Sequence, residues 1–134
     1  MKRLTTTILA AALLPGMLAC GKTAATAVGA GAAAAAAIAY NDRGATSQVT
    51  QSVSRTADAT EAAFRALGIT RTERKQETDG IELQGADGEW KFVVDIERDP
   101  GDTLSEIEVS VSKDQVNYSK DRAEQVLRAI LQRL

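Results

Sequence analysis

Few side chains in this sequence could do chemistry, and most of those are carboxylates. The chain has one cysteine, Cys20, and no histidine, which excludes a histidine general base and a histidine metal ligand. Two carboxylate pairs, Asp95 with Glu97 and Glu106 with Glu108, are spaced two residues apart and so share one face if their segments are β-strands. Charged residues on the water-facing side of a strand are the ordinary pattern, so a carboxylate-only enzyme is the least favoured function. We expect no catalytic residue, no cofactor and no metal site.

Cys20 follows a segment with the parts of a secretory signal. Lys2-Arg3 provides a positive start, residues 4–14 are apolar or uncharged, and the small residue Ala19 stands directly before the cysteine. The apolar stretch is shorter than the ~20 residues that a membrane-spanning helix needs. We therefore expect residues 1–19 to be a signal peptide that is removed, and we exclude them from the fold.

The residues Met17-Leu18-Ala19-Cys20 resemble the lipobox of bacterial lipoproteins, in which the cysteine receives a thioether-linked diacylglycerol. The resemblance implies lipidation at Cys20, which accounts for a lone cysteine in an exported chain. An ordinary signal with an incidental cysteine is the alternative. Two or more acyl chains make a stable anchor, so the membrane is the first expected partner. Gly21 resembles the outer-membrane class of enteric lipoproteins, which implies an outer-membrane location with the domain facing the periplasm.

Charge divides the rest of the chain into two regions. No acidic residue precedes Asp42, whereas the chain from Asn41 onward has 13 basic and 18 acidic residues. We expect residues 20–44 to be an Ala/Gly-rich tether, with helical, flexible and membrane-embedded forms all open, and residues 45–134 to be one small domain. The domain has no basic stripe, so nucleic acid is not an expected partner.

Hydrophobic periodicity predicts the order β-α-β-β-β-β-α for that domain. Alternation of apolar and polar residues is clearest in residues 89–97, where Trp90, Phe92, Val94 and Ile96 share one face, which we expect to lie in the core. Gly85-Ala86-Asp87-Gly88 predicts a hairpin turn before it. We expect an α+β fold with an antiparallel sheet of four to five strands and two helices packed on one face, like a helix-grip sheet. The expected strands are 45–53, 69–76, 80–84, 89–97 and 104–112, and the expected helices are 56–67 and 119–134. Ser54 or Thr56 can cap the first helix and Gly68 can end it, while Ser119 can cap the last helix.

The lipobox, the run AVGAGAAAAAAIAY, the segment ADATEAAFRALGI, the DGI and DGEW pair and the closing amphipathic helix resemble, in this order, a family of small bacterial lipoproteins of unknown function. The resemblance implies no catalytic residues. The favoured function is therefore a non-catalytic envelope lipoprotein that binds a partner protein or has a structural role. The alternative is a lipid or glycan binder that uses a cleft between the sheet and the helices.

Overall fold

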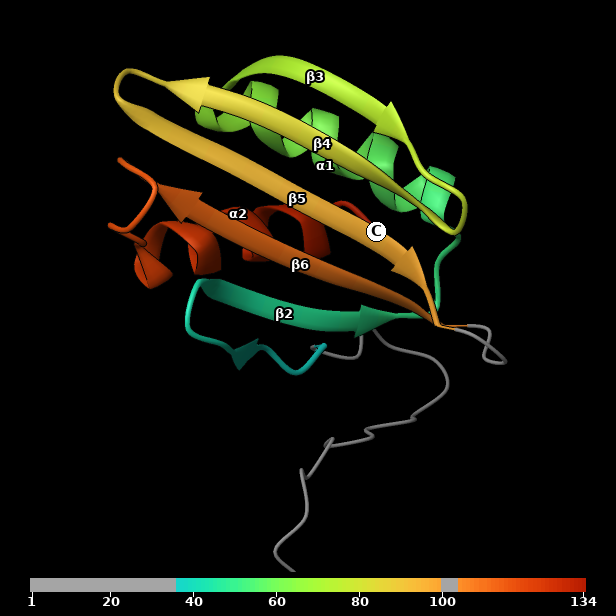
Figure 1. Ribbon diagram of the computed structural model, residues 1–134. Helices are drawn as coiled ribbons and strands as arrows, with labels where there is room; N and C mark the ends of the chain where they lie inside the picture. The colour runs from blue at the N-terminus through green and yellow to red at the C-terminus, as the bar shows by residue number, and fades with distance from the viewer. Residues whose placement is uncertain (1–35, 100–103) are drawn as a thin grey trace, which may run out of the picture.

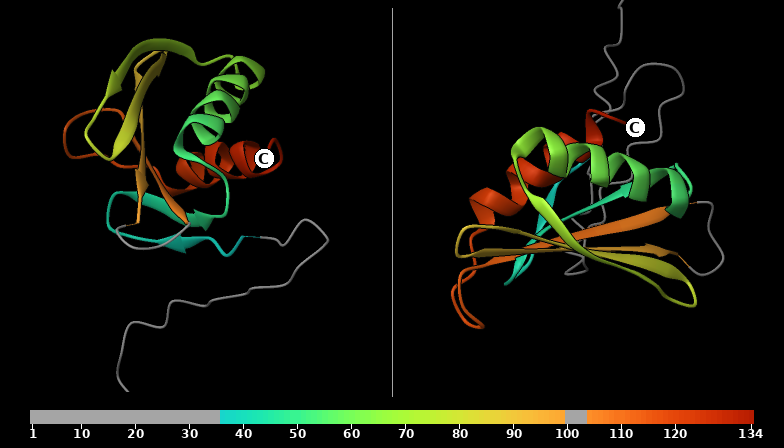
Figure 2. Two further views of the ribbon diagram at one scale, coloured as in Figure 1. Left: turned by 90° about the vertical axis from the view of Figure 1, so that its right-hand side faces the viewer. Right: turned by 90° about the horizontal axis from the view of Figure 1, so that it is seen from above.

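The computed structural model describes residues 36–99 and 104–134, which form a sheet with two helices on one side (Figures 1 and 2). Cys20, the expected signal peptide and residues 21–35 of the expected tether lie outside the described residues. The strands, in the order in which they lie across the sheet, are β1 (Ala39–Tyr40), β2 (Gly44–Val49), β6 (Ser105–Ser112), β5 (Trp90–Arg98), β4 (Gly80–Asp87) and β3 (Thr70–Gln76). All neighbouring strands are antiparallel.

This architecture confirms the expected α+β fold, with β1 as an additional strand. The order is β-β-α-β-β-β-β-α, because Ala39 and Tyr40, which the sequence analysis placed in the tether, pair with Thr46 and Ala45 of β2. Ser47 Oγ also donates a 3.1 Å hydrogen bond to the carbonyl oxygen of Ala37. The described part of the chain is therefore attached to the sheet from Ala37 onward.

Helix α1 (Val53–Leu67) begins earlier than its pattern predicted. The N-cap is Ser52, whose Oγ accepts from the Arg55 amide at 3.3 Å, and not Ser54 or Thr56. Val53 was expected to end the preceding strand, but it is buried in the first turn of the helix. The helix ends as predicted at Gly68, whose φ of 73° is the left-handed conformation that a C-terminal glycine adopts readily.

The hairpin between β4 and β5 turns later than the sequence predicted. Gly85 and Ala86 belong to β4, and the turn consists of Gly88 and Glu89, since Asp87 pairs with Trp90. Gly88 has a φ of 60°, and no non-glycine residue in the described chain has a positive φ. A positive φ at the first central position alone is typical of a type II′ turn, which matches the twist of the strands.

Both helices cover the same face of the sheet (Figure 2). Helix α1 packs on β3, β4 and β5, whereas α2 (Lys120–Leu131) packs on β2 and β6 and against α1. The N-cap of α2 is Ser119, as predicted. The core lies between the layers, and its largest fully buried apolar side chains are Phe64, Leu83, Val94, Ile96, Ile107, Val109, Val111, Val126, Leu127 and Ile130. The inward faces of β5 and β6 therefore agree with the sequence pattern. Leu104, which was expected to begin the last strand, lies just before β6.

Candidate functional site

One face of the sheet is not covered by the two helices. Side chains alternate along a strand, so the residues between the buried core positions project away from the helices. No described element of the chain covers this face (Figure 2). It carries six carboxylates and two lysines, a net charge of −4: Glu73, Glu82, Asp95, Glu97, Glu106 and Glu108 with Lys75 and Lys91. We call this surface the acidic face.

Strand register places three of these carboxylates in one row. Glu82 of β4 pairs with Asp95 of β5, and Asp95 pairs with Glu108 of β6. The next row towards the end of β5 contains the pair Glu97 and Glu106. Like charges directly opposite each other across a sheet are destabilising, so this arrangement costs free energy in the isolated domain.

Amide donors offset part of this repulsion at the two ends of the row. Gln84 Nε2 donates to Glu82 Oε1 at 2.7 Å, and Asn41 Nδ2 donates to Glu108 Oε1 at 2.8 Å. Both donors are neutral, so they orient the carboxylates without reducing the charge. Lys75 of β3 pairs with Glu82 at one end of the row, but the face as a whole keeps a net charge of −4, which an approaching cationic group would neutralise.

Asp95 lies at the centre of the row, and its pKa is raised in this position. Partial burial, followed by the charges of Glu82, Glu108, Glu77 and Glu97, raises the pKa of Asp95 to about 6. Burial and like charges both disfavour the ionised form of a carboxyl group. A shift of this size fits a general acid as well as a surface that binds cations, so the pKa does not by itself assign a function.

The two edges of the sheet are poor places for a partner strand to add. Strand β1 has two residues, and β3 at the other edge is exposed along its whole length, with four charged residues and a bulge between Arg71 and Glu73. Short edge strands, charges and bulges are devices that prevent strand addition. Strand addition is therefore disfavoured at both edges of the sheet.

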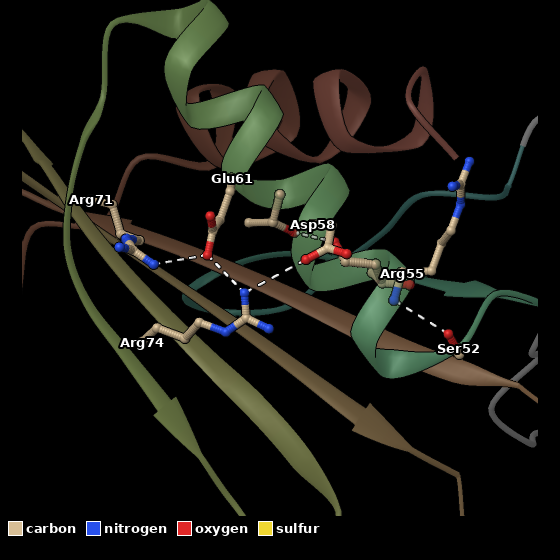
Figure 3. A network of polar contacts seen from close by, with 8 residues as sticks. Ser52, Arg55, Asp58, Glu61, Arg71 and Arg74 are labelled. Atoms are coloured by element: carbon tan, nitrogen blue, oxygen red, sulfur yellow. Dashed lines mark hydrogen bonds and ion pairs between the residues drawn. The ribbon is translucent and has the colours of Figure 1, made fainter.

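Two of the three basic side chains of β3, those of Arg71 and Arg74, attach this edge to α1 (Figure 3). Arg71 Nη1 and Arg74 Nη1 both donate to Glu61 Oε1, at 2.9 and 2.8 Å, and Arg74 also lies 3.6 Å from Asp58. The bond from Arg74, with the charges of both arginines, holds the pKa of Glu61 below its ordinary value. This network belongs to the packing of helix on strand and leaves the acidic face without a nearby arginine partner on β3.

A small cleft lies between the helices and the β4–β5 hairpin. It has a volume of about 280 Å³, and its lining residues come from the end of α1, the start of α2 and the β4–β5 hairpin. These three parts of the chain lie at the left of Figure 1. The lining residues are Leu67, Ile69, Asp87, Phe92, Arg122, Gln125 and Val126. This is the kind of cleft between sheet and helices that the alternative function requires.

The structure brings together the carboxylate pairs that the sequence analysis singled out. Asp95 and Glu97 lie on β5 beside Glu108 and Glu106 of β6, so that four separate candidates become one surface. Glu82 was not singled out, although its alternation with Ile81 and Leu83 in the sequence marks it as outward-facing. Trp90 was expected in the core, but it is only partly buried and lies under Arg122, whose Cζ is 4.7 Å from the ring centroid.

Within the described ranges, no group of three or more histidine, cysteine, aspartate or glutamate side chains is arranged to hold a metal ion. In the same part of the chain, no helix is long and apolar enough to cross a membrane. The chain matches no protein-family model and no curated protein sequence. The assignment of function therefore depends on the chemistry of the sequence and on the surfaces described above.

Proposed function

We propose that this protein is a membrane-anchored lipoprotein of the bacterial cell envelope that binds a partner protein without catalysing a reaction. The observation that carries the partner-binding part is the acidic face, a sheet surface with a net charge of −4 that no described element covers. The anchor part depends on the resemblance of residues 17–20 to a lipobox. In this proposal, the lipid is attached at Cys20 and the domain lies on the periplasmic side of the outer membrane.

The chemistry of the acidic face supports a basic partner. Three like-charged cross-strand pairs raise the free energy of the isolated domain, and a cationic surface laid across them would remove that repulsion. Complementary charge also accelerates association and excludes partners of the wrong sign. Around the carboxylates the face carries small or uncharged side chains such as Ala86, Val93 and Ser110, so a flat partner surface can approach closely.

The anchor is tested by labelling cells with radioactive palmitate and fractionating their membranes, for the wild type and Cys20→Ala. We expect label and outer-membrane location in the wild type and loss of both in the variant. If neither protein is labelled and both are soluble, the anchor is refuted and the domain is a free periplasmic or secreted module.

The partner surface is tested by photo-crosslinking in intact cells. A photoreactive amino acid at position 93, in the centre of the acidic face, is compared with one at position 65, on the exposed side of α1. We expect a salt-sensitive crosslink to a basic protein from position 93 only. Crosslinks from position 65 alone would contradict the assignment of the face.

A matched pair of triple variants separates the acidic face from overall charge. Glu82→Gln/Glu106→Gln/Glu108→Gln removes three charges from the face and keeps side-chain shape. Asp58→Asn/Asp114→Asn/Asp121→Asn removes the same number elsewhere on the exposed surface. We expect the first variant to lower crosslinking about tenfold, and the second to leave it unchanged. Equal effects of the two variants would show that only net charge matters.

A further inference from the structure

Asp95 has a carboxylate directly opposite it on each of its two neighbouring strands. Its row across the sheet takes one outward residue from each of five strands: Lys75, Glu82, Asp95, Glu108 and Thr46. The cation of this row, Lys75, is separated from Asp95 by Glu82, and its Nζ forms an ion pair with Glu77 Oε1 at 2.7 Å. Asp95 therefore lies between two acidic side chains and away from the lysine.

The other charged groups around Asp95 are mainly acidic as well. Glu97 occupies the next outward position of β5, and Glu106 of β6 lies directly opposite Glu97. Lys91 is on the same face of β5 but lies further away, near the start of the strand. The described helices pack on the opposite face of the sheet and bring no charged group to Asp95 (Figure 2). Partial burial and the surrounding carboxylates act in the same direction, and together they raise the pKa of Asp95 to about 6.

The repulsion within this row can be relieved in two ways, by a cation or by a proton. A cationic side chain of a partner favours the ionised form of Asp95. A proton on Asp95 removes the central charge and makes the carboxyl group an O–H donor, which Glu82 or Glu108 beside it can accept. The protonated row then has less charge to offer a cation.

We propose that a proton on Asp95 competes with the basic partner, so that the acidic face binds this partner more weakly in mildly acidic conditions than at neutral pH. The inference rests on the proposed function, because it concerns the regulation of the same surface. Its physical basis is the reciprocity of binding: if the partner favours the ionised carboxyl group, protonation weakens partner binding by the corresponding factor. The central position of Asp95 matters, since its charge acts on both flanking carboxylates.

The size of the effect follows from the pKa of Asp95 in the free and bound protein. The pKa is about 6 in the free protein, and a cation beside the carboxylate lowers it towards the ordinary value of 3.8. Affinity is therefore highest above about pH 7, where Asp95 is ionised in both states, and falls as the pH drops through about 6. At pH 5, Asp95 is mostly protonated when free and mostly ionised when bound, which lowers the affinity about tenfold relative to pH 7.5.

A defined cationic probe tests this inference without the natural partner. The full-length protein, purified in a non-ionic detergent, is titrated with a fluorescently labelled oligolysine peptide at pH 7.5 and pH 5, at one ionic strength because salt screens such contacts. We expect the peptide to bind about tenfold more weakly at pH 5. Nuclear magnetic resonance of the side-chain carboxyl carbons should show that Asp95 titrates near pH 6 in the free protein and at lower pH in the peptide complex.

One variant and a matched control assign the pH dependence to Asp95. Asp95→Asn removes the titrating group and keeps the side-chain shape, so its peptide affinity should differ by less than about twofold between the two pH values. Asp114→Asn, at an exposed position after β6, should keep the tenfold difference. Circular dichroism verifies that each protein is folded at both pH values. The proposal is overturned if the wild type binds equally at both pH values, or if Asp95→Asn keeps the tenfold difference.

The triple variant Glu82→Gln/Glu106→Gln/Glu108→Gln separates a failure of this inference from a failure of the proposed function. If the triple variant loses peptide binding while the wild type binds equally at both pH values, the acidic face remains the binding surface and control by Asp95 is refuted. If the triple variant binds the peptide as the wild type does at pH 7.5, the acidic face is not the binding surface and both proposals are overturned.

Discussion

Asp95 on β5 pairs directly with Glu108 on β6, and with Glu82 on β4 at its other side, so one half-buried carboxyl group lies between two others. Its pKa of about 6 in the folded protein exceeds the ordinary value of 3.8, which means that folding favours the protonated form. The contribution of this group to stability is therefore complete below about pH 4, falls as the pH rises to about 6, and stays low above that.

We predict from this relationship that Asp95→Asn stabilises the domain at neutral pH. Because Asp95 is only partly buried and solvent screens its interactions, the gain should be about 1 kcal/mol larger at pH 7.5 than at pH 4.5. Urea unfolding at the two pH values measures it. Asp42→Asn, in the exposed turn between β1 and β2, is the control, and a gain that is equal at both pH values would contradict the prediction.

A second prediction concerns two threonines that are both fully buried in α1. Thr60 Oγ1 donates to the Thr56 carbonyl oxygen at 2.9 Å, whereas Thr56 Oγ1 has no hydrogen-bond partner among the described residues. A buried hydroxyl without a partner costs about 1–3 kcal/mol. Thr56→Val should therefore raise the free energy of unfolding by about 1 kcal/mol, while Thr60→Val should leave it unchanged or lower it. Thermal unfolding compares them, and the idea fails if Thr56→Val is the more destabilising change.

A third prediction concerns the contact between α1 and β4. A Cβ atom at Gly85 would lie 2.6 Å from Ile69 Cγ2 and 2.9 Å from Phe64 Cε2, so the strand approaches the helix closely here. Phe64 also packs edge-on against Phe92, with ring centroids 6.4 Å apart, which leaves it little freedom to move. Gly85→Ala should destabilise the domain by about 1–3 kcal/mol, as overpacked cores do. Ala86→Ser, at the next position but on the open face, is the control and should change stability by less than about 0.5 kcal/mol.

A fourth prediction concerns the attachment of the N-terminal end of the described chain. Ser47 of β2 is 4% exposed, and its hydrogen bond to the Ala37 carbonyl oxygen joins residues 36–40 to β2. The hydroxyl group of Tyr40 also donates a hydrogen bond to Glu124 of α2. Ser47→Ala should increase hydrogen exchange at Ala39 and Tyr40 by about tenfold while leaving β5 unchanged, because only the local opening is affected. Thr46→Ala, on the other face of the same strand, is the control. Equal acceleration in β5 would show that the variant destabilises the whole domain instead.

Periodicity was sufficient to predict the central part of the sheet, and the serine side chain at position 119 was sufficient to predict the N-cap of α2. In β5 and β6 every second residue is apolar, and burial of one sheet face follows directly from that pattern. The ends of elements were less predictable. Val53 fits either a strand or a helix pattern, and the choice of Ser52 as N-cap depends on where β2 stops pairing with β6.

The candidate sites, too, were only partly predictable from the sequence. Glu106 and Glu108 are outward-facing from their own segment alone, but the row from Glu82 to Glu108 requires the register between three strands. The cleft combines α1, the β4–β5 hairpin and α2, which are far apart in the chain, so no local pattern contains it.

By itself, the sequence determined the class of the domain, the strands with one apolar face, the end of α1 at Gly68 and the N-cap of α2 at Ser119. It also determined the expectation of a lipid at Cys20. Each of these depends on residues that are neighbours in the chain. The tertiary structure decided which carboxylates share a row, how residues 36–40 attach to β2, and which residues of α1, the β4–β5 hairpin and α2 line one cleft. These features depend on strand register and on the placement of helices over the sheet, which are set by the packing of the whole core.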